Sequence, residues 1–323
     1  MLNVLSGFMV VVIIIALGYL VGRRRLLGPN AVYALNMFVF YLATPALLIN
    51  FLREADLATV FGENLAIVVI STLLAGAVGF LGYRFLARRP TSDSLITMLA
   101  CSYCNGSNLG VPITTHVLDD PTASLPVIIF QVALYGPATV LLLDVTTRKA
   151  RRDAADAGSN IGPLVRELVL GVIRNPLIVA AAVGIVLSLL YTNTGWTLPE
   201  MLAEPVALLA AGTVPAALVA FGLSMAEVSV LDRETSPRRS VWLAALTKTV
   251  VHPLIAYAAA RLLFDASGAA LLVFVVVAAL PTAQNVFTYS QRFGVNTVLA
   301  RDTAVISTML SIPSIAVITL LLG

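Results

Sequence analysis

The chain has 323 residues, of which 59% are hydrophobic and 11% are charged, with a formal net charge of +3. Soluble domains carry about 25% charged residues, so this composition excludes a water-soluble domain and predicts a protein embedded in lipid. The basic residues form short clusters between apolar stretches, a distribution that sets membrane topology, and no nucleic-acid partner is expected. The two cysteines, Cys101 and Cys104, support neither a disulfide framework nor a zinc site, and we expect no metal or cofactor.

Apolar stretches long enough to cross a bilayer recur along the whole chain. A membrane helix needs about 20 mostly apolar residues, and ten candidates satisfy this. The first apolar run lacks a preceding basic region and is followed by arginines, the reverse of a secretory signal, so we expect it to remain in the mature protein. The ten predicted spans are 4–22, 33–52, 64–86, 94–117, 124–147, 167–191, 203–225, 240–263, 268–291 and 299–322.

Basic residues fall almost entirely on one side of this predicted arrangement, which holds 17 of the 20. The positive-inside rule makes that side cytoplasmic, so both termini are predicted to lie outside the cytoplasm of a multi-pass cell-membrane protein, in the plasma or inner membrane. The polar segment 148–163 is predicted to be a flexible cytoplasmic linker. It separates two five-span domains, 1–147 and 164–323, of opposite orientation.

The two halves show weak internal similarity, which is typical of transporters built from inverted repeats. The second span (44–51) and the seventh (214–221) carry Pro45 and Pro215 in register, where we expect kinks. Residues 104–108 align with 281–285 at an offset of 177, which places Asn108 on Asn285. Pro137 and Pro313 match one residue out of register.

Polar and small residues interrupt the fourth span over 105–112 and the ninth span over 281–285. We expect the helix to unwind at these two places. Irregular backbone at membrane depth is tolerated only where protein or a water-filled cavity surrounds it, and transporters bind substrate at such breaks. Helix N-termini meeting there would favour a carboxylate. The alternative is that these residues serve packing and interhelical hydrogen bonding. Substrate contacts are assigned to Asn105, Ser107, Asn108, Thr282, Gln284 and Asn285, and the break itself to Cys104, Gly106, Gly110, Pro112 and Pro281.

At these residues the chain resembles the auxin efflux carrier family, which includes plant PIN-formed carriers and bacterial permeases linked to malate and malonate. The similarity rests on Asn105 with 110–112 and on 281–323, and it covers nearly the whole chain. It implies the crossover fold shared with bile-acid transporters and sodium–proton antiporters. It also implies a scaffold domain of spans 1, 2, 6 and 7, often dimeric, and a transport domain of spans 3–5 and 8–10 that moves as an elevator. Cys104 departs from the family, which has proline there, whereas Pro281 keeps its counterpart.

Ionisable residues inside membrane spans are functional candidates. Lys248 resembles a basic position of the family and is expected either to support the crossover or to replace a coupling cation. His252 is a candidate proton carrier, although a hydrogen bond to a neighbouring helix explains it equally well. Asp144, His116 and Glu227 lie near predicted span ends, where solvation at the interface explains them.

These patterns predict a secondary transporter of a small organic anion, and the resemblance implies that it carries an auxin-like acid or a dicarboxylate by alternating access as a homodimer. Auxin is a poor first choice of substrate, because the long cytoplasmic loop of many plant members of the family is reduced here to about 148–163. A channel-like anion pore is the first alternative, and an intramembrane enzyme or receptor using Cys101, Cys104, Ser102, His116 or His252 is the second. No HExxH, GxSxG or paired-carboxylate motif supports catalysis. The coupling ion, sodium or proton, is left open.

Overall fold

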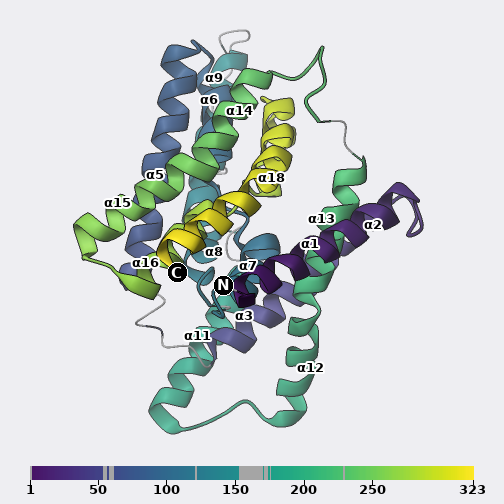
Figure 1. Ribbon diagram of the computed structural model, residues 1–323, viewed down its shortest axis with the longest axis vertical. Helices are drawn as coiled ribbons and strands as arrows, with labels where there is room; N and C mark the ends of the chain where they lie inside the picture. Colours follow the sequence, from purple (N-terminus) through teal and green to yellow (C-terminus); the bar gives the residue numbers. More distant parts are fainter. Residues whose placement is uncertain are drawn as a thin grey trace. The chain divides into compact units, whose positions relative to one another are not determined.

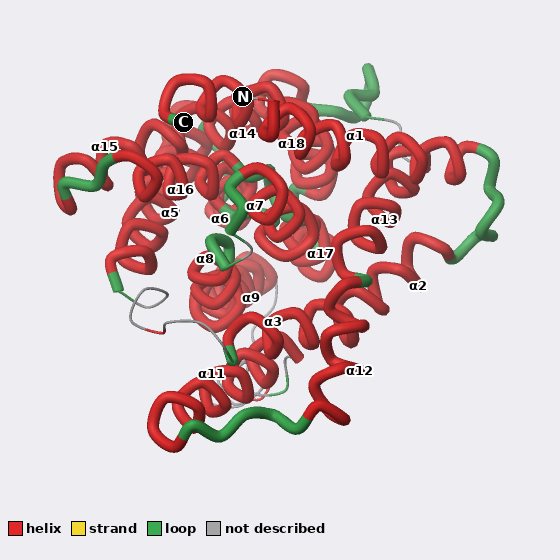
Figure 2. The backbone as a smooth tube through the Cα atoms, turned by 60° about the horizontal axis from the view of Figure 1, so that its bottom comes forward, coloured by secondary structure: helices red, strands yellow, loops and turns green. Residues whose placement is uncertain are grey.

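A computed structural model of the chain describes residues 2–53, 57, 62–120, 122–152, 170, 174, 176–227 and 230–323. These residues form helices joined by short connections (Figures 1 and 2). Within the described ranges, extended pairing is limited to one isolated bridge between Cys104 and Thr282. The predicted all-α class is confirmed for this part of the chain.

Five of the described helical segments are long and apolar enough to cross a membrane, and several shorter apolar helices accompany them. Leucines at the helix surfaces are largely exposed, for example 70% at Leu208, 82% at Leu262 and 76% at Leu321, which suits a lipid environment. A multi-pass protein is therefore supported, while the count of ten spans stays a prediction. The five long segments are Ala31–Leu52, Glu63–Leu86, Glu200–Ala226, Arg238–Phe264 and Thr297–Leu322.

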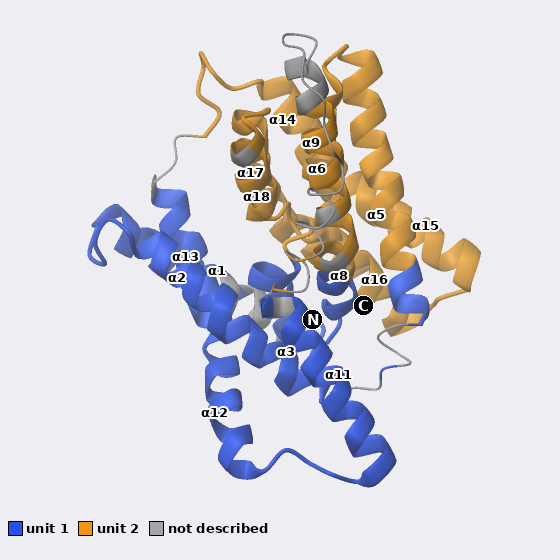
Figure 3. Ribbon diagram, turned by 180° about the vertical axis from the view of Figure 1, so that it is seen from behind, with its two compact units in different colours: residues 1–66, 106–129, 175–229 blue, residues 67–105, 130–174, 230–323 orange. Residues whose placement is uncertain are grey.

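The chain divides into two compact units (Figure 3). Unit 1 comprises residues 1–66, 106–129 and 175–229, and unit 2 comprises 67–105, 130–174 and 230–323. The fourth predicted span is therefore shared between them, with the boundary after Asn105. The predicted repeat domains, and the scaffold and transport domains, stay predictions.

Unit 1 is made mainly of apolar helices with π-helical turns at two points. Its elements are α1 (Leu2–Arg23), α2 (Ala31–Phe38), η1 (Val39–Ala43), α3 (Thr44–Leu52), η3 (Gly106–Gly110), α7 (Val111–Val117), most of α8 (Leu125–Phe130), α11 (Pro176–Thr194), α12 (Glu200–Ala211) and α13 (Thr213–Glu227).

Helices α1 and α13 pack backbone to backbone inside unit 1. A Cβ added at Gly18 would lie 2.5 Å from the Val219 carbonyl oxygen, and one added at Gly222 would lie 2.7 Å from the Tyr19 nitrogen. Both distances are far below van der Waals contact, so only glycine fits at these two positions. Close approach through small residues is a usual source of packing energy between membrane helices, where lipid removes the hydrophobic driving force.

Unit 2 contains the remaining helices. They are most of α5 (Glu63–Leu81), η2 (Gly82–Leu86), α6 (Thr91–Ser102), η4 (Gln131–Tyr135), α9 (Gly136–Arg152), α14 (Arg238–Leu246), η5 (Thr247–Val251), α15 (His252–Phe264), α16 (Gly268–Ala279), α17 (Gln284–Phe293) and α18 (Thr297–Leu322). Part of its core is a cluster of five buried residues: Ile67, Ala260, Leu271, Phe274 and Val275.

Helix α9 runs further than the sequence indicated. It continues to Arg152, so the first residues of the predicted linker 148–163 are helical. The stretch from Thr147 to Arg152 contains lysine, alanine and arginines, which are good helix formers, and their propensity extends the span beyond its apolar part. Residues 153–163 lie outside the described ranges.

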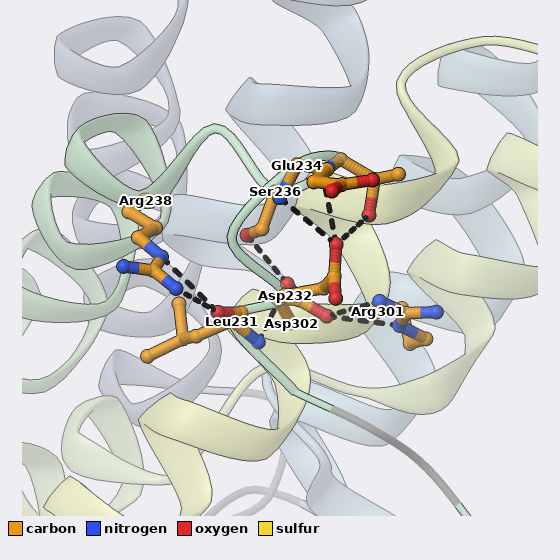
Figure 4. Close-up of polar contacts among 8 residues, drawn as sticks. Leu231, Asp232, Glu234, Ser236, Arg238, Arg301 and Asp302 are labelled. Atoms are coloured by element: carbon orange, nitrogen blue, oxygen red, sulfur yellow. Dashed lines mark hydrogen bonds and ion pairs between the residues drawn. The ribbon is translucent and has the colours of Figure 1, made fainter.

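A polar cluster joins the loop that precedes α14 to the beginning of α18 (Figure 4). The fully buried carboxylate of Asp302 accepts hydrogen bonds from the Leu231 backbone N–H at 3.1 Å and the Ser236 hydroxyl at 2.6 Å. Arg301 adds an ion pair at 2.8 Å. Nearby, backbone N–H groups of Glu234 and Thr235 donate to the exposed Asp232 and hold the pKa of its carboxyl below the ordinary value. The loop is therefore fixed to α18 at both of its ends.

Candidate functional site at two helix interruptions

The first interruption lies between α6 and the π-helical turn η3. Helix α6 ends at Ser102, Tyr103 is extended with φ −76° and ψ 107°, and helical structure resumes at Gly106. The sequence predicted unwinding over residues 105–112, which is too late along the chain. Pro112 stands at the start of α7, where a missing N–H costs nothing, so it begins a helix there instead of breaking one.

The second interruption lies between α16 and α17, as predicted. Helix α16 ends at Ala279, and α17 begins at Gln284 after an extended Ala283 with φ −72° and ψ 148°. Pro281 lies in the middle of the four non-helical residues. Proline cannot donate to a helical ladder, which accounts for the break at this point.

Backbone hydrogen bonds join the two interruptions to each other. The Asn105 N–H donates to the Pro281 carbonyl oxygen at 2.7 Å, and the Ala283 N–H donates to the Tyr103 carbonyl oxygen at 3.0 Å. This is the pattern of a minimal antiparallel bridge. It supplies partners for backbone groups that would otherwise lie bare at membrane depth, where an unsatisfied group costs several kcal/mol.

Side chains from each interruption also bond to the last turn of the opposite helix. The Thr282 hydroxyl donates to the Ala100 carbonyl in α6 at 2.6 Å, and the Cys104 thiol lies 3.6 Å from the Val277 carbonyl in α16. Under the offset of 177, Ala100 and Val277 are equivalent positions. Each interruption therefore contributes a side-chain cap to the helix that ends at the other, although the Val277 carbonyl also accepts from the Leu280 N–H at 3.3 Å.

Two residues that sequence reasoning missed fix the interruptions from neighbouring spans. Gln131, buried in η4, accepts from the Cys104 N–H at 2.5 Å and donates from Nε2 to the Cys104 carbonyl at 3.2 Å. Ser307 in α18 accepts from the Thr282 N–H at 3.0 Å. A signal was present, because the offset of 176 that aligns Pro137 with Pro313 also aligns Gln131 with Ser307.

Lys248 is fully buried in η5 and lies against the last turn of α16, just before the second interruption. Its ammonium donates to the Ala278 carbonyl, in the last turn of α16, at 2.6 Å, and lies 3.2 Å from His252 Nδ1. The C-terminal end of a helix carries partial negative charge, which compensates a cation there. His252 Nε2 is buried and has no hydrogen-bond partner among the described residues.

Aromatic rings from two elements pack against Tyr103 of the first interruption inside unit 2. Tyr103 stacks on Tyr135 of η4 at a centroid distance of 6.0 Å, and Tyr289 of α17 packs edge-on against Tyr103 at 6.3 Å. Ser102 and Tyr135 share a hydrogen bond of 2.7 Å. These contacts restrict the extended Tyr103 in addition to its backbone bond with Ala283.

The residues assigned to substrate differ in accessibility. Asn105 and Thr282 are buried, whereas Gln284 is half-buried and Asn285 is exposed. The Thr282 hydroxyl is engaged by Ala100, which leaves Asn285 as the accessible polar group beside this pairing. Ser107 and Asn108, half-buried in η3, belong to unit 1, and their hydroxyl and carboxamide oxygens lie 3.5 Å apart. Their role stays a prediction.

The other candidates belong to helices or helix starts and take no part in the backbone pairing. Gly106 is buried, and a Cβ there would lie 2.9 Å from an Ile128 side-chain carbon, so packing accounts for this glycine. Gly110 precedes α7 as its N-cap. Pro45 follows the π-helical turn η1 at the start of α3, and Pro215 is the third residue of α13.

Of the ionisable residues assigned to span ends, His116 is exposed in the last turn of α7 and Asp144 is half-buried in α9. Glu227 is the last residue of α13. The side-chain surroundings of Glu227 lie outside the described part of the structure.

Comparison of the sequence with known proteins identifies the family of this chain. The model of a family described as "Membrane transport protein" matches residues 4–319. A protein of Rhizobium meliloti named "Putative malonate transporter" is 27% identical over 310 residues, covering 94% of this chain and 90% of that protein. "Auxin efflux carrier component 8" of Arabidopsis thaliana is 22% identical over 363 residues, covering 97% and 95%. The chain is therefore a transmembrane transporter that belongs to the membrane transport protein family, the family of the auxin efflux carriers.

Proposed function

We propose that the protein is a secondary carrier of a small carboxylate and that the substrate binds beside the paired interruptions. The observation that carries this proposal is the double backbone pairing of Asn105 with Pro281 and of Ala283 with Tyr103. A transporter places irregular backbone at membrane depth where substrate binds. The relative named as a malonate transporter makes malonate the first candidate substrate.

An anion is favoured because α17 begins at the interruption with its N–H end. Helix starts leave backbone N–H groups without intrahelical partners and carry about half a positive charge. Such an end stabilises a partly buried anion by up to about 2 kcal/mol, roughly thirtyfold in affinity. Asn285, exposed in the first turn of α17, offers a carboxamide to the same ligand.

Lys248 provides the fixed positive charge of this region. A buried ammonium is costly unless it is hydrogen-bonded, and the Ala278 carbonyl meets that need at 2.6 Å. We propose that the lysine stands where a transporter coupled to a metal cation would bind its ion, so that sodium is not required. A proton carried by His252 is the alternative form of coupling.

The proposal includes alternating access by an elevator movement of a transport domain against a dimeric scaffold, with the site at the crossing of the fourth and ninth spans. It places the protein in the plasma or inner membrane with both termini outside the cytoplasm, on the evidence of the basic clusters. A tag at either terminus should be reached by a protease or antibody from outside intact cells. Access only after permeabilisation would reverse the orientation.

Counterflow in proteoliposomes tests the carrier. Vesicles preloaded with unlabelled malonate should accumulate labelled malonate transiently, because a carrier exchanges substrate across the membrane whereas a channel only dissipates the gradient. Malonamide, the neutral diamide, should not drive exchange. Equal exchange with the diamide would contradict the anion site, and steady malonate flux without exchange would favour the channel. If malonate is not exchanged, other carboxylates are screened for those that raise the melting temperature of the protein, since a ligand that binds the folded state stabilises it.

Two variants locate the site. Asn285→Ala should raise the KM for the acid at only a small cost in melting temperature, since the side chain is exposed and the buried contact it loses is a hydrogen bond with Tyr103. Asn105→Ala should also impair uptake at near-normal expression. The matched control is Asn193→Ala, in the exposed last turn of α11. Wild-type uptake in both site variants would remove the site from the interruptions.

A further inference from the structure

The two interruptions occupy equivalent positions in the chain but differ in one covalent feature. Position 281 is proline, whose ring fixes φ near −65° and removes the N–H. The equivalent position 104 is cysteine, which leaves φ free to rotate and retains an N–H donor. A free backbone at that depth needs a restraint from elsewhere, and the N–H needs an acceptor.

Gln131 meets both needs with one side chain. Its carboxamide oxygen lies 2.5 Å from the Cys104 nitrogen, and its Nε2 lies 3.2 Å from the Cys104 carbonyl oxygen. A carboxamide that bonds to the N–H and the C=O of the same residue holds both peptide planes flanking that residue. The side chain is 1% exposed, so water does not compete for these bonds.

The Gln131 backbone is tied to the same segment. Its carbonyl accepts from the Tyr103 hydroxyl at 3.3 Å and from the Gly136 N–H, which closes the π-helical turn η4. The extended residues Tyr103 and Cys104 are therefore both held from this one position. At the second interruption a side chain of α18 bonds to the backbone once, where Ser307 accepts from the Thr282 N–H.

We propose that Gln131 is a positioning residue that substitutes for the missing proline: its carboxamide fixes Cys104 and, through it, the geometry of Asn105 against Pro281. Its effect on transport rests on the proposed function, because it assumes that substrate binds at the interruptions. Its effect on the backbone does not rest on that function. Leucine at 131 keeps the volume but removes both bonds, and glutamate keeps the acceptor but loses the Nε2 donor.

The backbone effect is measured through Cys104 itself. Because the chain has only two cysteines, a Cys101→Ala protein carries one thiol, which is 2% exposed. In membranes of that protein, Gln131→Leu should increase the rate of N-ethylmaleimide labelling at least about tenfold, and Gln131→Glu should have a smaller effect. Gln291→Leu, at an exposed glutamine of α17, is the matched control and should leave the rate unchanged. An unchanged rate for Gln131→Leu in folded protein overturns the proposal.

The transport effect is measured as a split between KM and turnover. Gln131→Leu should raise the KM for malonate about tenfold, because the site is less well formed. Adding Cys104→Pro should restore most of the affinity, since the proline fixes φ and removes the N–H that lost its acceptor. A double variant as impaired as Gln131→Leu overturns the substitution. Faster labelling with an unchanged KM would support the positioning role and place the substrate site elsewhere, so the two proposals fail separately.

Discussion

At position 104 the first interruption has a cysteine held by the Gln131 carboxamide, whereas at the equivalent position 281 the second has a proline with no N–H to hold. Around this difference the two regions match, because each uses a side chain to cap the helix that ends at the other and each donates one backbone bond across the pair. The two interruptions thus reach one geometry by two means, a proline ring at residue 281 or the Gln131 amide at residue 104. The backbone pairing, rather than a proline, is the feature that they share.

The largest effect is expected from removing one bond of the pairing. Ala283→Pro suits the observed φ of −72° but deletes the N–H that donates to Tyr103 and presses the ring against that carbonyl. We expect a loss of about 2–3 kcal/mol in unfolding free energy and near-complete loss of uptake. Melting in detergent and uptake in vesicles measure the two. Ala283→Ser keeps the N–H and serves as the control, and full uptake by the proline variant would show that the pairing is dispensable.

A smaller loss is expected from removing the cap that the second interruption places on α6. Thr282→Val keeps the shape but leaves the Ala100 carbonyl without the hydroxyl at 2.6 Å, which should cost about 1–2 kcal/mol. The control is Thr249→Val. The hydroxyl of this buried threonine donates to the Ala245 carbonyl within the same helical run, where the carbonyl depends less on a side-chain donor. Equal melting temperatures for the two variants would contradict the capping role.

The reciprocal cap from the first interruption should be weaker, because a thiol is a poor donor. Cys104→Ala and Cys101→Ala each remove one buried sulfur, so their difference compares the contacts of Cys104 with Val277, Ser102 and Lys248 against that of Cys101 with Thr247. We expect Cys104→Ala to be less stable by under about 1 kcal/mol. A difference larger than that of the Thr282→Val pair would reverse the ranking of the two caps.

No effect is expected from replacing sodium with potassium. The Lys248 ammonium lies at the end of α16, beside the second interruption, and it also interacts with Cys104 of the first, so under the proposed function it stands where a metal cation would bind. Initial rates of uptake and ligand-induced melting shifts should therefore be the same in both salts. A sodium-dependent melting shift that Lys248→Met abolishes would show that a metal ion and the lysine act together, against the proposed replacement.

Sequence reasoning located both interruptions because asparagine, glycine and proline at successive positions have few explanations inside an apolar helix. It placed the first too late, since it counted Pro112 as a breaker where the structure uses it to start α7. It assigned Thr282 to substrate, and no local pattern could reveal that its hydroxyl bonds to Ala100 far along the chain.

Gln131 was missed for the same physical reason. A single amide in an apolar span resembles ordinary interhelical hydrogen bonding, and its partner is identified only when the fold brings residue 104 beside it. Internal symmetry was the one available guide, because the offset of 176 pairs Gln131 with Ser307.

The glycine contact between α1 and α13 has a consequence for biosynthesis. Gly18 and Gly222 are 222 − 18 = 204 residues apart, so at about 5–20 residues per second a ribosome needs roughly 10–40 s to make the partner after the first helix. Until then no residue of α13 can cover the Gly18 face of α1. This is tolerable because a helix satisfies its own backbone. The early helices must therefore insert one by one as independently stable segments, and translation time sets when they can close against the late ones.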